Sequence, residues 1–325
     1  MKVNFLGDVF LDKQYKIKFD LNNYIFNLEY PLSKTGIPAK NKVNLGVDNS
    51  YILDTFTKFP IAVNLANNHI MDYGEESYHE TINYLKNHNI QYFGAGNISN
   101  NFNNPCTLTD NNQIIKLFGY CCESTHSVCG TNFSNGSAPL DLNLIQNDIS
   151  KAKDNNCFIV INLHWGDEEI SHPKPIDIKI AKAIIDLGAD LIIGHHAHVI
   201  QNIETYRGKK IFYGIGNFLF PNLNVPSMFN GKKFTNNYIK NQILKNRESI
   251  ILEIDSFNKV TYKTTYFDND KVILKKIRIS SWMPKTQKSY DLYVNYSKKV
   301  GTIKRFLKNP KIPSLNQFKI FLGLK

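Results

Sequence analysis

The sequence predicts a mixed α/β protein in which two stacked sheets are flanked by helices and extended by β-hairpins. Before about residue 200, short apolar segments alternate with longer segments of helical periodicity, which is the pattern of β-α-β units. Later apolar segments are separated by short turns, which favours antiparallel strands. The 325 residues, 42% hydrophobic and 12% aromatic, suffice for one large core, or for one core and an appendage.

The N-terminal elements follow from apolar periodicity and from residues that cap helices. The expected strands are 2–6, 24–28, 61–65 and 92–94, and the expected helices are 49–58 and 75–89. Asn49 or Ser50 would cap the first of these helices.

The middle of the chain predicts a hairpin and then a further β-α-β unit. The elements are strands 106–108 and 114–118 across the turn Asp110-Asn111-Asn112, helix 140–155 with Asp141 near its start, strand 158–163, helix 175–187 with Gly188 as its stop, and strand 191–193. The antiparallel strands that follow are 200–206, 210–213, 249–254, 260–266 and 271–279. Segment 221–247, rich in Asn, Lys and aromatic residues, is expected to be a long excursion over the surface.

Histidines follow three of the predicted strands at the point where each strand ends. Strand 191–193 enters Gly194-His195-His196-Ala197-His198, strand 158–163 ends at His164, and strand 61–65 is followed by Asn67-Asn68-His69. The carboxyl edge of a sheet is where α/β enzymes gather metal ligands, and imidazole is the commonest of them. The pattern therefore predicts a metal site. In the later segment Gly216-Asn217-Phe218, we expect a turn whose Asn orients nearby groups.

The net charge of +11 is concentrated near the C-terminus. Residues 1–227 carry 18 basic and 22 acidic side chains, whereas residues 228–325 carry 21 and 6. Within 283–325, ten basic residues face only Asp291, so we expect a main domain over 1–282 and a basic tail over 283–325. The apolar residues spaced among the basic residues of the tail predict short amphipathic helices that are interrupted by Pro310 and Pro313. It is either an arm that binds a polyanion or anionic lipid, or a solvated tail without a ligand.

Cysteine usage and hydropathy bear on the cellular compartment. The five cysteines are an odd number without C-x-x-C spacing, which favours reduced, structural thiols. The N-terminus lacks the pattern of a signal peptide, and no apolar segment is long enough to span a bilayer. We therefore expect a cytoplasmic protein, peripheral to the inner face of the membrane if its tail binds lipid.

Six motifs, in order, resemble the CapA family of capsule and poly-γ-glutamate synthesis proteins. They are Gly7-Asp8, Asn27-Leu28-Glu29, Asn64 to His69 followed by Asp72-Tyr73-Gly74, His164-Trp165-Gly166 with Glu168, Gly194 to His198 with Gln201, and Tyr213 to Phe218. They span about residues 1–220. That family is similar to the calcineurin-like metallophosphoesterases, so the resemblance implies a four-layer α-β-β-α sandwich, a two-metal centre and a capsule-related role.

Carried over position by position, the resemblance implies a set of metal ligands: Asp8, Glu29, Asn68, His164, His196 and His198. Many phosphoesterases have a histidine two residues after the first aspartate, where this chain has Phe10, so one metal loses a ligand. His195 would substitute if the register slips by one. Carboxylate, amide and imidazole together suit two divalent ions of Mn, Fe or Zn better than Ca or Mg.

Two further residues have implied catalytic roles. His69 would stabilise the developing charge or protonate the leaving group, and Glu168 would fix an imidazole tautomer from outside the ligand shell. Taken singly, Asp8 and Glu29 would be ordinary turn or loop residues, and His69 a capping or core histidine.

The implied function is that of a metal-dependent hydrolase or transferase that acts on a phosphoester or on a bond of a surface polymer. The alternative is a non-catalytic polymer-handling or assembly factor that retains the fold. The expected partner is an anionic surface polymer or its precursor, and not nucleic acid. Through 283–325, the chain would also contact an anionic membrane surface or a membrane-bound synthase.

Overall fold

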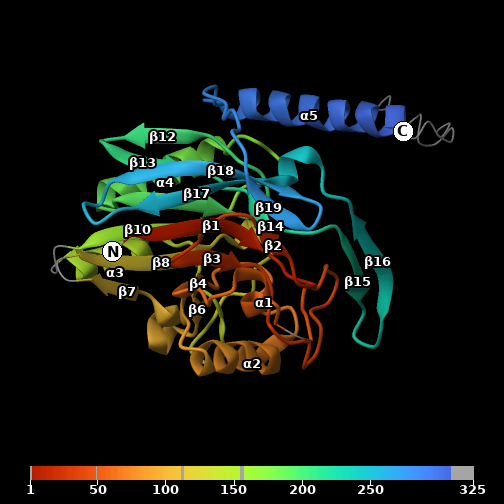
Figure 1. Ribbon diagram of the computed structural model, residues 1–325, viewed down its shortest axis with the longest axis horizontal. Helices are drawn as coiled ribbons and strands as arrows, with labels where there is room; N and C mark the ends of the chain where they lie inside the picture. The colour runs from red at the N-terminus through yellow and green to blue at the C-terminus, as the bar shows by residue number, and fades with distance from the viewer. Residues whose placement is uncertain (1, 49, 111–112, 154–156, 309–325) are drawn as a thin grey trace. The chain divides into compact units, whose positions relative to one another are not determined.

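The computed structural model describes residues 2–48, 50–110, 113–153 and 157–308. The chain divides into a large unit, Met1–Met283, and a second unit, Pro284–Lys325. In the large unit, helices are interspersed among the strands up to β11, and the elements that follow are mainly strands (Figure 1). This order is the one that the hydrophobic pattern predicts.

The first sheet of the large unit has nine strands. Eight follow one path, in the order β2 (Lys16–Ile17), β19 (Lys271–Leu274), β18 (Val260–Asp268), β17 (Glu248–Ile254), β1 (Val3–Val9), β3 (Tyr24–Leu28), β4 (Ala62–Asn64) and β5 (Gln91–Phe93), and β14 (Asn217–Leu219) pairs with β1. Strands β1, β3, β4 and β5 are parallel, whereas β17, β18 and β19 form the antiparallel extension expected for the late strands.

The second sheet has six strands, in the order β12 (Ile203–Tyr206), β13 (Lys209–Phe212), β11 (Leu191–His195), β10 (Phe158–His164), β8 (Gln113–Cys121) and β7 (Cys106–Asp110). Its central strands β8, β10, β11 and β13 are parallel, and the predicted hairpins β7–β8 and β12–β13 close its two edges. The turn residues Asn111 and Asn112 of the first hairpin lie outside the described residues.

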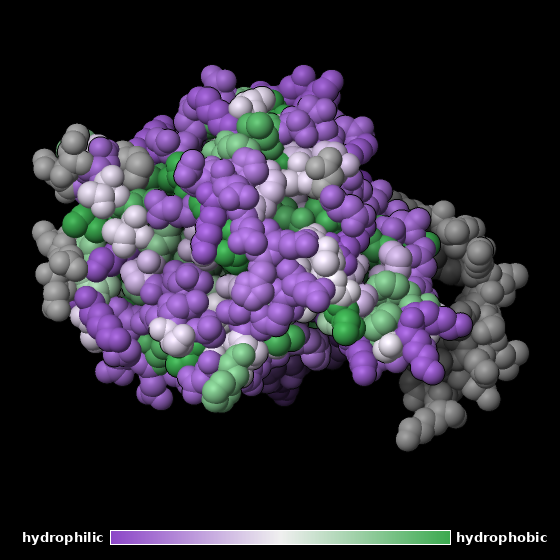
Figure 2. Space-filling view, turned by 90° about the horizontal axis from the view of Figure 1, so that it is seen from below, coloured by the Kyte–Doolittle hydropathy of each residue, from purple (hydrophilic) through white to green (hydrophobic). Residues whose placement is uncertain are grey.

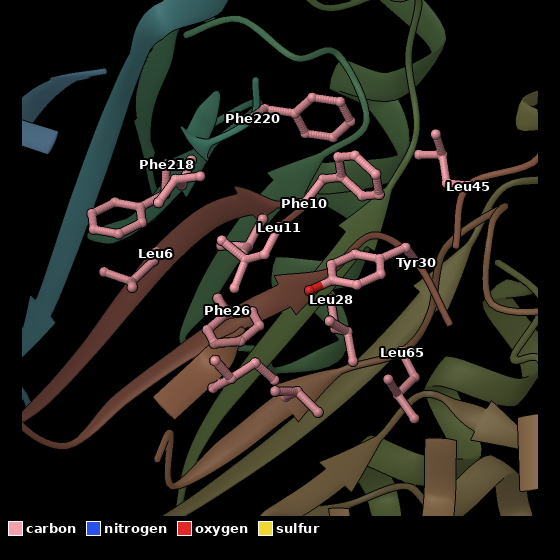
Figure 3. Close-up of a cluster of buried hydrophobic side chains, with 14 of the residues drawn as sticks. Leu6, Phe10, Leu11, Phe26, Leu28, Tyr30, Leu45, Leu65, Phe218 and Phe220 are labelled. Carbon is pink, nitrogen blue, oxygen red and sulfur yellow. The ribbon is translucent and has the colours of Figure 1, made fainter. Parts of the chain in front are cut away.

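Alternation along each strand directs side chains into separate apolar layers. Ile25 and Ala62 of the first sheet share a buried cluster with Val160 and Leu191 of the second, so this cluster lies between the sheets. Neighbouring residues such as Phe26 point to the opposite face (Figure 3). Because successive residues of a strand point to opposite faces, each sheet needs an apolar layer on both sides. The other sheet packs on the inner face, and helices pack on the outer face.

The helices cover the two outer faces. Apolar residues of α1 (Ile52–Phe56) and α2 (Gly74–Asn87) join the outer cluster of the first sheet. Those of α3 (Leu142–Lys153) and α4 (Pro175–Leu187) join that of the second sheet. The fold is therefore the four-layer α-β-β-α sandwich that the family resemblance predicted. The face of the molecule seen in Figure 2 is mainly hydrophilic.

The helix boundaries depend on local capping. Asp141 caps α3 by accepting the backbone N–H groups of Asn143 and Leu144 at 2.7 and 2.9 Å, as expected. Gly188, with φ at 117°, ends α4 at the predicted residue. The prediction of a helix over 49–58 was too long. Thr57 turns into the left-handed region at φ 62°, so α1 is confined to 52–56 and its cap position is Tyr51.

Segment 221–247 forms a defined two-stranded ribbon in addition to surface loops. Strand β15 (Leu223–Phe229) pairs antiparallel with β16 (Phe234–Lys240) across a turn at Gly231. The sequence did not indicate these strands, because polar residues such as Asn interrupt their apolar positions and the ribbon lies outside the two main sheets. We refer to β15, β16 and their turn as the arm.

The described part of the second unit, up to residue 308, contains one helix, α5 (Gln287–Lys308), where shorter helices were expected. Pro310 and Pro313 lie outside the described residues. Among the described residues, no helix combines the length and apolar character needed to cross a membrane. All five cysteines are free, as their spacing predicted.

Candidate metal centre

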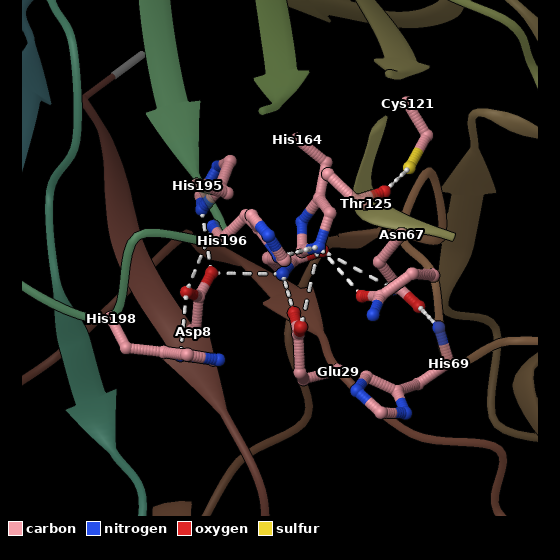
Figure 4. Close-up of polar contacts among 12 residues, drawn as sticks. Asp8, Glu29, Asn67, His69, Cys121, Thr125, His164, His195, His196 and His198 are labelled. Carbon is pink, nitrogen blue, oxygen red and sulfur yellow. Dashed lines mark hydrogen bonds and ion pairs between the residues drawn. The ribbon is translucent and has the colours of Figure 1, made fainter. Parts of the chain in front are cut away.

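The carboxyl ends of parallel strands from both sheets meet at one place. Asp8 lies near the end of β1, Glu29 directly follows β3, and His164 ends β10. The turn after β4 supplies Asn68. The turn after β11 supplies His196 and His198 (Figure 4). Residues that are up to 190 positions apart in the chain thus share one buried site.

Three predicted ligands converge on the imidazole of His164, which is a predicted ligand itself. Its Nε2 lies 2.9 Å from Asn68 Oδ1, 3.1 Å from His196 Nδ1 and 3.4 Å from Glu29 Oε1. One ring nitrogen carries at most one hydrogen, so it cannot satisfy three such neighbours. A bound cation would satisfy all of them together. We call these four residues the Glu29 group.

Unpartnered atoms in the Glu29 group also fit a metal. Glu29 Oε1 and His164 Nδ1 are buried and have no hydrogen-bond partner among the described residues, whereas buried polar atoms usually have one. Ligand atoms of Glu29, His164 and His196 lie within 4.8 Å of one another. Burial, reinforced by His198, lowers the pKa of His196 to about 4. Its imidazole is therefore neutral at pH 7, and the neutral form binds metal.

A second set surrounds the Asp8 carboxylate. Asp8 Oδ1 is 2.9 Å from His195 Nδ1, and Oδ2 is 3.3 Å from His198 Nδ1. Burial alone would raise the pKa of Asp8, but the two histidines outweigh it and hold this pKa well below its usual value. Phe10, at the position where the resemblance implied a lost ligand, packs edge-on against Tyr30 with ring centres 4.9 Å apart.

Asn27 connects the two sets. Its Nδ2 group donates to Asp8 Oδ1 at 2.8 Å and also to Glu29 Oε2. Its Oδ1 accepts hydrogen bonds from Asn64 and Asn67, so the amide is fixed on both sides. Two buried carboxylates repel each other, and this shared donor holds them together. The sequence motif contained Asn27, but nothing in its spacing indicated this contact.

Asp72 holds the imidazole of His69. Its Oδ2 lies 2.6 Å from His69 Nδ1, while its Oδ1 lies 2.6 Å from Lys42 Nζ. Burial lowers the pKa of His69, and the Asp72 carboxylate opposes this effect. Sequence reasoning did not assign a role to Asp72, although the separation of three residues from His69 within one motif was a usable signal.

The histidine turn after β11 is tightly constrained. His196 and His198 adopt φ values of 78° and 55°, a region that costs energy for residues with side chains and is often found at functional sites. His198 Nδ1 lies 2.8 Å from Asn217 Oδ1, so Asn217 orients this ring as expected from its motif. A Cβ atom at Gly194 would lie 1.8 Å from the carbonyl oxygen of Tyr213, which explains the glycine at the start of the turn.

A pocket of about 690 Å³ opens beside these groups. His69, His196 and His198 line one part of it, together with Asn68 and Phe220. Glu168 also lines it, and its carboxylate lies 3.2 Å from Lys240 Nζ. Burial would raise the pKa of Glu168, but His198 and Lys240 outweigh it and lower this pKa to about 2. The role of Glu168 in fixing an imidazole tautomer stays a prediction, and the hydrogen-bond partner of His198 Nδ1 is Asn217.

The fold and these side chains define the class of the protein: an α-β-β-α sandwich with a cluster of histidine, carboxylate and amide groups at the sheet edge. A family profile described as bacterial capsule synthesis protein PGA_cap matches residues 3–222. The chain therefore belongs to this family, and the matched range contains every predicted site residue.

Curated relatives carry related names. Residues of the chain are 36% identical over 162 positions to the capsule biosynthesis protein CapA of Bacillus anthracis, covering 49% of the chain and 39% of the relative. The PGA biosynthesis protein CapA of Bacillus subtilis is 34% identical over 159 positions, covering 49% and 42%. A probable polyglutamine synthesis accessory protein of Mycobacterium tuberculosis is 28% identical, covering 59% and 54%. The chain thus spans about two fifths to one half of these relatives' lengths.

Solved structures show only a distant likeness. A 5'-nucleotidase precursor from Thermus thermophilus aligns with a TM-score of 0.37 and 15% identity, over 75% of this chain and 44% of that one. The NAD nucleotidase of Haemophilus influenzae aligns with a TM-score of 0.37 and 10% identity, over 92% and 67%.

Proposed function

We propose that the protein is a metal-dependent hydrolase or transferase of capsule polymer synthesis, which acts on a phosphoester or on a bond of the polymer. The observation that carries this proposal is the convergence of the Glu29 group on one nitrogen beside an open pocket. The names of the relatives support poly-γ-glutamate, or a precursor of it, as the partner.

Two divalent ions fit the donor set. The Glu29 group would hold one, and Asp8, Glu29 and His198 would hold the other, with His195 beside them. Imidazole, amide and carboxylate ligands favour Mn, Fe or Zn. Such ions, when bound, lower the pKa of a bound water and polarise the substrate oxygen. The side chains then have to position the substrate and move a proton.

His69 is suited to handle that proton. Asp72 accepts the Nδ1 hydrogen and stabilises the charged ring, which leaves Nε2 for a substrate group in the pocket. A carboxylate that orients an imidazole in this way fixes its tautomer. In our proposal His69 contacts the leaving group and Asp72 is its positioning residue.

A non-catalytic polymer-handling or assembly factor is the second candidate. Two observations favour it: Phe10 replaces one expected ligand, and both oxygens of Asp8 already contact histidines. In this case, the metal of the Glu29 group would have a structural role.

Turnover of two probes distinguishes the candidates. We expect manganese-loaded protein to release nitrophenol from bis(p-nitrophenyl) phosphate or to shorten poly-γ-glutamate, and to lose this activity on chelation. His164→Ala should be inactive, whereas His88→Ala, which changes a histidine at the end of α2, should be fully active. Metal-loaded protein that transforms neither probe would favour the assembly factor.

A further inference from the structure

Two segments that are hydrogen-bonded to each other line part of the pocket beside the metal site. One is the arm, which contributes Leu223, Tyr238 and Lys240, and the other is segment 39–45, which contributes Lys40 and Lys42. Met228 N donates to Lys42 O at 2.9 Å, and Asn41 N donates to Phe229 O at 3.1 Å. These bonds make the arm and segment 39–45 a single wall.

Lys240 is fixed on this wall by two acidic residues. Its Nζ lies 3.2 Å from Glu168 and 3.2 Å from Glu169, and only 13% of the side chain is exposed. An ammonium group carries three N–H donors, so these two contacts leave one for an acceptor in the pocket. Although burial would lower the pKa of Lys240, the two glutamates raise it, so the group stays charged.

Lys42 is held in a similar way on the side nearer to the metal site. Its Nζ lies 2.6 Å from Asp72 Oδ1 and 2.5 Å from the carbonyl oxygen of Asn68. One N–H donor again remains for a ligand. Lys40, which is exposed, adds a third positive charge to the lining.

We propose that Lys42 and Lys240 form a subsite for the free carboxylates of a polyanionic chain, adjacent to the bond held at the metal site. This inference rests on the proposed function and names the part of the pocket that selects the polymer. Both ammonium groups are already ordered, so a carboxylate binds them at little cost in side-chain entropy. Charge-assisted hydrogen bonds to carboxylates are also stronger than neutral ones. A chain with one free carboxylate per repeat, such as poly-γ-glutamate, fits this chemistry.

Binding of the polymer tests the subsite without depending on turnover. The probe is fluorescently labelled poly-γ-glutamate, titrated with the full chain and followed by anisotropy. We expect Lys240→Gln to weaken binding about 10-fold, which is the effect of losing one hydrogen bond to a charged group. Lys240→Arg should bind within about threefold of the parent, since it keeps the charge. Lys276→Gln, an exposed lysine outside the pocket lining, makes the same change in net charge and should bind normally.

Metal content and thermal unfolding of each variant show whether it is folded. Folded Lys240→Gln that binds the polymer as tightly as the parent would overturn the subsite, as would a parent chain that does not bind. Binding that depends on Lys240 in a protein without turnover would support the subsite and refute only the enzymatic part of the proposed function.

Discussion

His69 and its neighbour Asn68 are adjacent in the chain but have different partners. The amide of Asn68 faces His164, whereas the ring of His69 faces Asp72. In our proposal, this division places Asn68 at the metal and His69 at the substrate. A substitution of His69 should therefore separate metal binding from turnover.

We predict that His69→Asn keeps its metal and loses about 10²–10⁴-fold in turnover, the usual contribution of a general acid or base. Metal content by mass spectrometry and hydrolysis of bis(p-nitrophenyl) phosphate are the two measurements. Asp72→Asn should also keep its metal and lose turnover, by a smaller factor. Loss of metal from His69→Asn would instead place this histidine among the ligands.

At the scale of elements, β1 and β14 approach so closely that only glycine fits between them. A Cβ atom at Gly7 would lie 1.9 Å from the carbonyl oxygen of Gly216, and this oxygen accepts the backbone N–H of Asp8 at 3.0 Å. The pairing of these two strands therefore sets the position of Asp8.

We predict that Gly7→Ala lowers the free energy of unfolding by about 1–3 kcal/mol, as is typical of overpacking, and weakens metal binding because Asp8 moves. Urea denaturation and metal titration measure the two effects. Gly301→Ala is the control, because a Cβ atom there meets nothing within 4 Å and alanine favours the helix. Equal stability of Gly7→Ala and the parent would show that the strands can separate.

A buried aspartate at the start of α4 should make the free energy of unfolding depend on pH. Asp177 accepts the backbone N–H of Lys174 at 3.3 Å, and burial raises its pKa to about 6. An unfolded aspartate titrates near 3.9, so the folded chain binds this proton more tightly. The resulting stability is present below about pH 4 and is lost as the pH rises through 6.

We therefore expect the parent chain to lose about 1–2 kcal/mol more than Asp177→Asn between pH 4.5 and 7.5. Urea denaturation of both proteins across this range tests the expectation. Parallel pH profiles would mean that Asp177 is not the titrating group.

The elements most accurately predicted were those whose sequence signals are local. Pro175 and Gly188 bracket α4, and apolar runs mark β3 and β10. The arm was missed because polar residues interrupt the apolar positions of its strands and because it pairs with segment 39–45 and not with a main sheet. The histidines of the site could be predicted because each follows an apolar strand in the sequence. The contacts of Asn27 with Asp8 and of Lys240 with Glu168 could not, because only the fold brings these residues together.

At the scale of the whole molecule, the two units differ in net charge, and the second unit is strongly basic. We propose that 283–325 holds the chain at an anionic membrane surface. Ten basic residues face one acid there, and Leu292, Tyr296 and Ile303 share one face of α5 by their spacing. Each basic residue near such a surface contributes about 1 kcal/mol before screening.

Cosedimentation with vesicles tests this role. The full chain should bind phosphatidylserine vesicles at low salt and not phosphatidylcholine vesicles, and a chain truncated after Trp282 should bind neither. Equal binding of both chains to anionic vesicles would exclude the segment as an anchor and leave it as a solvated tail.

The central claim is that histidines from two strand ends hold metal together with Glu29. Its most direct test is the metal content of purified protein after expression in metal-replete medium. We predict about two Mn, Fe or Zn ions per chain, with a clear loss in His164→Ala and His196→Ala and none in His88→Ala. A parent chain without metal, or unchanged metal in both ligand variants, would contradict the account.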